Sequence, residues 1–392
     1  MATPLELLFD LTLVVAVGQA ASQLAHLLAE GHVRAGLIAF GFAVFAVVWA
    51  WINFSWFASA FDTDDVPFRL ATMVQMVGVC ILALGLPDLF HSIDEGAHVD
   101  NRVVIVGYVI MRLAMVFQWL RAARQSREHR TACLTYALAI AVAQVGWVVV
   151  ALLNLALLPT AVGILVCILI EFAGPWVAET RRGGTPWHAH HIAERYSLFA
   201  IIALGEGIVG TVAALSASEE VSHGVTADVI VVGLAGVGMT FFMWWSYFIL
   251  PAGPVLHVRR DRSFGWGYGS LVLFGAIIAT GAGLDVAGLS LEGDSALTPA
   301  QTVACVAVPV GVYLVSLLVL YSLLLKAVDL FHVWLAVGAL VILAAAVGLA
   351  AAGVPLPVAL LVVLLAPAAF VAAYETLGHR HVAADLAALE RG

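Results

Sequence analysis

Twelve long apolar stretches dominate this sequence. A helix needs roughly 20 apolar residues to cross a hydrocarbon core about 30 Å thick, and each stretch approaches that length. The stretches begin near Leu5, Arg34, Val66, Val99, Thr131, Leu157, His188, Thr226, Phe264, Pro299, Ala327 and Leu356. They predict an all-α integral membrane protein with about 12 transmembrane helices, whose main partner is the lipid bilayer.

The composition excludes a water-soluble globule. Of 392 residues, 63% are apolar and 11% are charged, whereas soluble domains carry about a quarter charged residues. The net charge of −9 is concentrated in a few acidic loops, so we predict no nucleic-acid partner. His188, His190, His191 and Glu194 include i,i+3 spacings that suit a metal, but no second ligand cluster completes a site. We therefore predict no metal and no cofactor.

The distribution of basic residues predicts the orientation. Short cytoplasmic loops retain Lys and Arg. With the N-terminus inside, 13 of the 17 basic residues fall on inner loops and the C-terminal tail, and only Arg34 and Arg102 fall on outer loops. This asymmetry predicts cytoplasmic N- and C-termini and supports an even number of spans.

The two halves of the chain resemble each other. A shift of 187 residues places residues 9–19 on residues 196–206, with apolar, acidic and glycine positions in register. Six spans per half would make both halves enter from the same side, as in transporters with parallel repeats. We predict one integrated membrane domain built from two six-helix repeats, 1–187 and 188–392. The alternative is a chance alignment of apolar helices.

Two opposite charges are expected near the middle of the membrane. An ionisable group at this depth is costly to insert and marks a candidate site. Glu206 lies twelve residues beyond Glu194, or about 18 Å deeper along a helix. Arg112 is the predicted partner of Glu206, because it lies more than three turns into its own span. With Gln19 nearby, the pair either moves a solute or pins helices together.

Glycines flank Glu206 and spell G-x-G-x-x-G from Gly205 to Gly210. A dinucleotide site needs this motif between a strand and a helix, whereas here it lies inside an apolar run. We interpret the glycines as positions of close helix approach.

A second group of charges gathers at the predicted cytoplasmic ends. Glu6 and Asp10 are four residues apart and share a helical face. The proposed members are Glu6, Asp10, Asn53, Asp62, Asp65, Arg69, Glu194 and Arg195. They form either helix caps and interfacial ion pairs, or an inner gate or proton relay in which Asp10 titrates.

Several of these motifs resemble the bacterial low temperature requirement protein A family, LtrA. They are Glu6-Leu7-Leu8-Phe9-Asp10-Leu11, Phe61-Asp62-Thr63-Asp64-Asp65 with Arg69, Tyr108 with Arg112, and residues 191–195 leading to Gly205-Glu206. The resemblance implies a multi-pass protein of the bacterial cytoplasmic (inner) membrane, associated with growth at low temperature. It implies no settled activity. The family commonly has serine where this chain has Gly207.

The first functional hypothesis is a secondary transporter, with proton coupling, for an unknown small solute or ion. The alternatives are an ion channel, an enzyme acting on lipid or envelope precursors with Glu6, Asp10 and Glu194 as acid/base groups, and a sensor or scaffold that transports nothing. The absence of a nucleophile–base motif makes an enzyme the weaker choice. Whether the chain forms an oligomer stays open.

Overall fold

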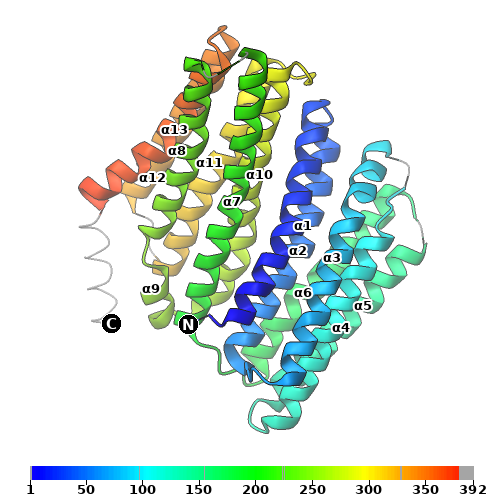
Figure 1. Ribbon diagram of the computed structural model, residues 1–392. Helices are drawn as coiled ribbons and strands as arrows, with labels where there is room; N and C mark the ends of the chain where they lie inside the picture. Colours follow the sequence, from blue (N-terminus) through cyan, green and yellow to red (C-terminus); the bar gives the residue numbers. More distant parts are fainter. Residues whose placement is uncertain are drawn as a thin grey trace. The chain divides into compact units, whose positions relative to one another are not determined.

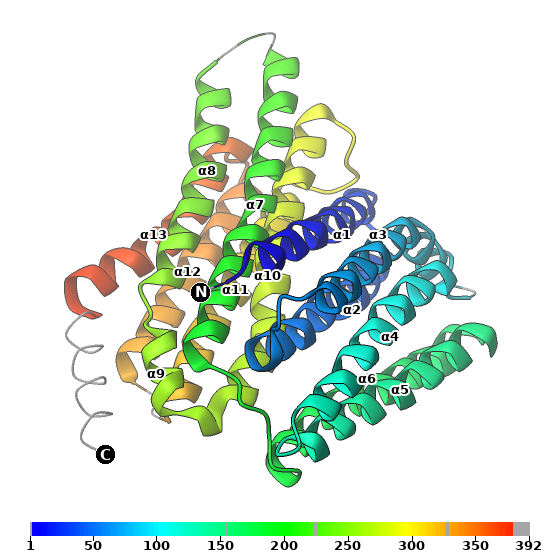
Figure 2. The ribbon, with the colours of Figure 1, turned by 60° about the horizontal axis from the view of Figure 1, so that its bottom comes forward.

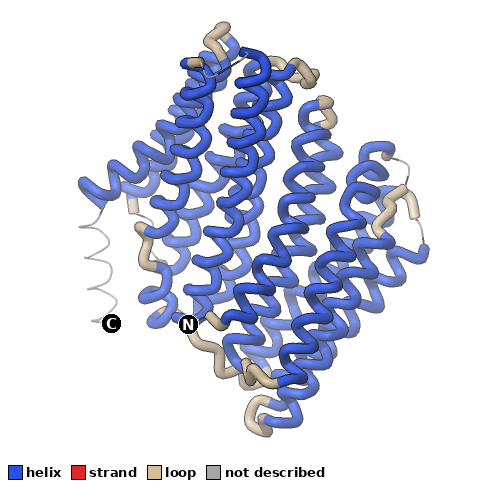
Figure 3. The backbone as a smooth tube through the Cα atoms, viewed as in Figure 1, coloured by secondary structure: helices blue, strands red, loops and turns tan. Residues whose placement is uncertain are grey.

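The computed structural model describes residues 2–378, apart from residues 97, 154, 223, 225, 327 and 328. Its described part contains 12 helices long and apolar enough to cross a membrane, as the sequence predicts. Eleven predicted starts lie within three residues of an observed helix start. The remaining prediction, Ala327, lies outside the described residues, and that helix begins at Leu330. Figure 3 shows the helices in blue with tan connections.

Many large apolar side chains point outward from the helices. Leu84 is 76% exposed, Leu152 is 79% exposed and Leu158 is 75% exposed. A soluble monomer rarely exposes large apolar patches, but lipid tails cover such side chains in a bilayer. The outward faces therefore agree with a membrane environment.

The described residues fall into two compact units. Unit 1 takes those within Met1–Gln23 and Leu37–Arg195, and unit 2 takes those within Leu24–Gly36 and Tyr196–Gly392. Three helices contribute residues to both units: α1 (Pro4–Ala29), α2 (Val33–Phe61) and α7 (Ala189–Ser222). The predicted six-helix duplication, divided after residue 187, stays a prediction, because compactness is no measure of repeat symmetry.

Unit 1 contains most of α1, the start of α7 and five further helices. These are α2 (Val33–Phe61), α3 (Val66–Glu95), α4 (Arg102–Gln125), α5 (Arg130–Leu153) and α6 (Leu157–Arg181). Figures 1 and 2 show α3 and α4 running side by side. Glycines permit this approach: a Cβ atom at Gly107 would lie 2.8 Å from the Cα atom of Leu82. Aromatic rings fill the remaining core, with Trp49 of α2 against Phe172 of α6 at a centroid distance of 4.6 Å.

Unit 2 contains the rest of α7 and six further helices. These are α8 (Ala227–Phe248), α9 (Ala252–Val258), α10 (Ser263–Glu292), α11 (Pro299–Leu325), α12 (Leu330–Ala351) and α13 (Leu356–Ala373). A 3-10 turn, Arg260–Arg262, precedes α10, and a π turn, Tyr374–Gly378, follows α13. Close backbone approach also shapes this unit, because a Cβ atom at Gly283 of α10 would lie 2.7 Å from the carbonyl carbon of Cys305 of α11.

The eighth span ends in a break that the sequence analysis does not predict. Helix α8 stops at Phe248, and the seven-residue α9 begins at Ala252. Pro251 stands between them and supplies the reason, because proline donates no backbone hydrogen bond and disfavours helical conformation in the residue before it. The break places irregular backbone beside the cavity described below.

Candidate functional site

Asp10 and Arg195 form a fully buried ion pair inside unit 1. Arg195, at the start of α7, donates from Nη1 to Oδ2 of Asp10 at 2.8 Å and from Nη2 to Oδ1 at 2.7 Å. Trp51 of α2 donates its indole N–H to Oδ1 at 2.9 Å. Such bidentate pairs are among the stronger charge-assisted hydrogen bonds. The contacts join three helices through one carboxylate.

Glu6 lies one turn before Asp10 and extends this cluster. The predicted shared face is confirmed, since Nε of Arg195 lies 3.9 Å from Oε1 of Glu6. Nε2 of His191 lies 3.3 Å from Oε2. Glu6 also accepts from the backbone N–H of Thr3 at 2.7 Å, while the Thr3 hydroxyl accepts from the Glu6 N–H at 3.3 Å. This reciprocal pair is a capping box, so Glu6 caps α1.

Arg112 of α4 forms its ion pair with Glu171 of α6. The prediction that Glu206 is its partner is therefore wrong. Position along a span reveals the depth of a side chain but not which neighbouring helix it faces. Glu206 is selected as an acid in the middle of an apolar run. Glu171 meets the same criterion, but the sequence analysis does not select it.

Four donors surround the Glu171 carboxylate, whose side chain is 0% exposed. Oε2 accepts from Arg112 and from the Trp49 indole N–H at 3.0 Å. Oε1 accepts from the Tyr108 hydroxyl and from the Gln144 amide, each at 3.1 Å. Hydrogen bonds to the charged form stabilise it. Glu171 is thus a satisfied anion that ties four helices together.

Glu206 lies on the part of α7 that belongs to unit 2, and its surroundings differ. It is 7% exposed, and within its unit it forms no ion pair or side-chain hydrogen bond with any described residue. The predicted close packing holds for Gly210, where a Cβ atom would collide with the carbonyl oxygen of Gly281 of α10, but not for Gly205, where nothing lies within 4 Å of the Cβ position. The motif lies inside one continuous helix, which excludes the strand–turn–helix context of a dinucleotide site.

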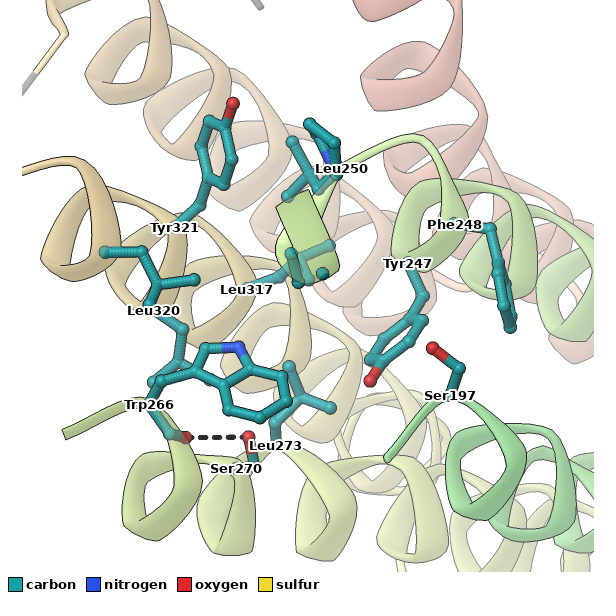
Figure 4. Close-up of a pocket in the computed structure, with 14 residues that line it drawn as sticks. Ser197, Tyr247, Phe248, Leu250, Trp266, Ser270, Leu273, Leu317, Leu320 and Tyr321 are labelled. Carbon is teal, nitrogen blue, oxygen red and sulfur yellow. Dashed lines mark hydrogen bonds between the residues drawn. The ribbon is translucent and has the colours of Figure 1, made fainter. Parts of the chain in front are cut away.

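A cavity of about 140 Å³ lies in unit 2 beside the break between α8 and α9. Figure 4 shows Tyr247, Trp266 and Tyr321 around it, with the hydroxyls of Ser197 and Ser270 among the lining groups. Neither Glu206 nor Arg112 lines it. A cavity of about 150 Å³ holds a benzene-sized molecule, and all the lining side chains here are uncharged.

Hydrogen bonds and ion pairs fix the acidic loop before α3. Asp65 caps α3 by accepting from the Phe68 N–H at 3.1 Å and is paired with Arg121. Arg69 donates to both carboxylate oxygens of Asp64, at 2.9 and 2.8 Å. The hydrogen bond from Arg69 lowers the pKa of Asp64, and that from Arg121 lowers the pKa of Asp65.

Four further candidates are Asp62, Asn53, Gln19 and Glu194. Burial raises the pKa of Asp62, which accepts from the Asp64 N–H at 2.8 Å. Asn53 donates to the carbonyl of Trp49 on its own helix at 2.9 Å. Gln19 and Glu194 are half-buried. Asp62 also interacts electrostatically with Glu6 and His191, and the inner gate stays a prediction.

Comparison with known proteins agrees with the family resemblance described in the sequence analysis. Residues 1–367 match the family described as bacterial low temperature requirement A protein (LtrA). The chain belongs to the LtrA family. An uncharacterized protein of Rhizobium meliloti (strain 1021) is 28% identical over 301 residues, which cover 71% of this chain and 68% of the relative. The buried charges of this LtrA protein lie within the matched region.

Proposed function

We propose that this LtrA protein is a proton-coupled secondary transporter in which Glu206 carries the coupling proton. The observation that supports this proposal is the contrast between Glu206 and the other buried acids. An ionised side chain at bilayer depth is unfavourable by about 2.5–3.5 kcal/mol on insertion scales. Because no described cation of its unit pairs with it, the carboxylate gains stability when a proton or a cation binds.

The cavity in unit 2 is the proposed solute site. Ser197, which lines it, and Glu206 both lie on α7. They are nine residues apart, or about 13 Å along the helix axis. One continuous helix thus connects the two, and movement of α7 when Glu206 changes charge would alter the cavity. The uncharged lining favours a small neutral solute.

The packing of α7 also suits movement. Gly205 has no other atom within 4 Å of where its Cβ would lie, whereas Gly207 lies close to Thr240 of α8. Glycine in a helix interior lowers its stability by about 1 kcal/mol relative to alanine. The segment around the acid therefore has an open side at Gly205 and close contacts with α8 and α10.

The test is reconstitution in liposomes that contain a pH-sensitive dye. An imposed proton gradient is combined with one external solute at a time, beginning with neutral sugars, amino acids, Na⁺ and K⁺. We expect one solute to cause proton movement with the wild-type protein and none with Glu206→Gln. The matched control is Glu220→Gln, which removes an exposed acid from the same helix and should leave the flux unchanged.

Two results contradict the proposal. One is a folded Glu206→Gln variant with wild-type flux. The other is a wild-type protein that moves protons with none of the solutes. A current that flows without a coupling gradient would instead identify a channel.

A further inference from the structure

A lipid-facing groove in unit 2 combines an apolar bed with a basic rim. It has a volume of about 530 Å³ and lies between α11 and α12. Its bed includes Val315, Val319 and Leu323 of α11 and Val333 and Ala336 of α12. At one end the side chains of Arg262 and Lys326 close it.

We propose that this groove binds one anionic glycerophospholipid, with an acyl chain on the apolar bed and the phosphate at Arg262 and Lys326. The dimensions fit this occupant. Val315 and Lys326 are eleven residues apart, or about 16 Å along a helix, and half of a hydrocarbon core is about 15 Å. The groove is therefore as long as one leaflet is deep.

The charges at the rim favour an anion. Arg262 is 38% exposed and Lys326 is 44% exposed. Asp261 lies 3.4 Å from both Nε of Arg262 and Nζ of Lys326, so it offsets one of the two charges. Arg259 and Arg260 precede it in the same turn and keep the local charge positive. Basic pockets between membrane helices commonly bind phosphorylated head groups.

The backbone conformation at Lys326 is unusual for a lysine. Lys326 adopts the left-handed conformation, with φ of 59°, at the C-cap of α11, where glycine or asparagine is favoured. The backbone at this position disfavours lysine. A lysine is nevertheless present, which is expected if its charge binds an anion.

The experiment measures lipid retention by native mass spectrometry and thermal stability in detergent. Purified protein is titrated with phosphatidylglycerol, with phosphatidylcholine as the neutral lipid and with soluble glycerol phosphate as the head group alone. We expect the wild-type protein to prefer phosphatidylglycerol. A basic side chain that contacts the head group contributes about a five-fold preference, so Arg262→Gln and Lys326→Asn should each lower it about five-fold. Asparagine is chosen because it tolerates the left-handed backbone.

Arg260→Gln is the matched control, because it removes the same charge two residues from Arg262 without lining the groove. It should keep most of the preference. An equal loss in this control would mean diffuse surface attraction and overturn the proposal, as would equal binding of both lipids or equal stabilisation by glycerol phosphate. Ala336→Trp keeps every charge and fills the bed, so it should lower retention of phosphatidylglycerol; unchanged retention contradicts the groove as the site.

Discussion

Glu171 in unit 1 and Glu206 in unit 2 are both buried acids in the middle of apolar helices, yet their environments are opposite. Glu171 accepts hydrogen bonds from four side chains, including Arg112. Glu206 has no such donor in its unit among the described residues. Burial alone therefore does not identify a charge that has a function beyond stability. An acid whose oxygens accept several hydrogen bonds holds helices together, whereas an acid without such donors can take up or release a proton.

The largest expected effect follows from breaking the Arg112–Glu171 pair. Arg112→Met leaves Glu171 as an uncompensated buried charge and should lower the free energy of unfolding by about 3–5 kcal/mol. Denaturant titration of the purified protein in detergent measures this. Arg102→Gln, which breaks the exposed pair with Asp100, is the control and should stay near wild type. An equal effect of both variants would show that the buried pair has no special role.

The double variant Arg112→Met with Glu171→Leu sharpens the same comparison. Replacing a whole buried pair by apolar residues is often neutral or stabilising. We therefore expect it to recover most of the stability that Arg112→Met loses. Failure to recover would mean that the Tyr108, Trp49 and Gln144 hydrogen bonds, rather than charge pairing, stabilise the site.

Trp51→Phe should have an intermediate effect. It removes the indole N–H that donates to Asp10, and a hydrogen bond to a charged group contributes about 1.5–3 kcal/mol. The unfolding free energy should fall by that amount. Trp334→Phe, at a side chain 66% exposed, serves as the control, and a comparable loss there would contradict a specific role for the Asp10–Arg195 cluster.

Helix packing around Glu206 is tested by Gly281→Ala. The added Cβ atom would meet the backbone of Glu206, and overpacking typically lowers stability by about 1–3 kcal/mol. Gly205→Ala is the matched control, because nothing lies within 4 Å of its Cβ position. If Gly205→Ala destabilises unit 2 as much, the close approach of α7 and α10 is not what the glycines provide.

The smallest effect concerns the exposed loop before α3. The pKa values of Asp64 and Asp65 are lowered by Arg69 and Arg121, so their contribution is present above the ordinary carboxyl pKa and is lost as the pH falls below about 4. Hydrogen exchange of residues 62–69 should therefore accelerate between pH 5 and pH 3, after correction for intrinsic rates. Asp65→Asn should show a weaker pH response, and an identical response would exclude these pairs as its cause.

The sequence predicts the spans well because the length of an apolar run is a direct consequence of bilayer thickness. It also places Arg112 and Glu206 near the middle of long apolar helices, where the structure has them. It does not reveal Glu171 as the partner of Arg112, or the pairing of Asp10 with a residue 185 positions away, because contacts between distant helices leave no local pattern. Pro251 marks the break after α8, but proline alone does not locate a break, because four other prolines lie inside continuous helices: Pro87, Pro175, Pro309 and Pro367.

The most direct test compares proton-coupled flux between Glu206→Gln and the double variant Arg112→Met with Glu171→Leu, in the same liposomes and at equal amounts of folded protein. The proposed roles predict flux in the double variant and none in Glu206→Gln. Flux that survives in Glu206→Gln but disappears in the folded double variant would place the transport charge in unit 1 and contradict the account.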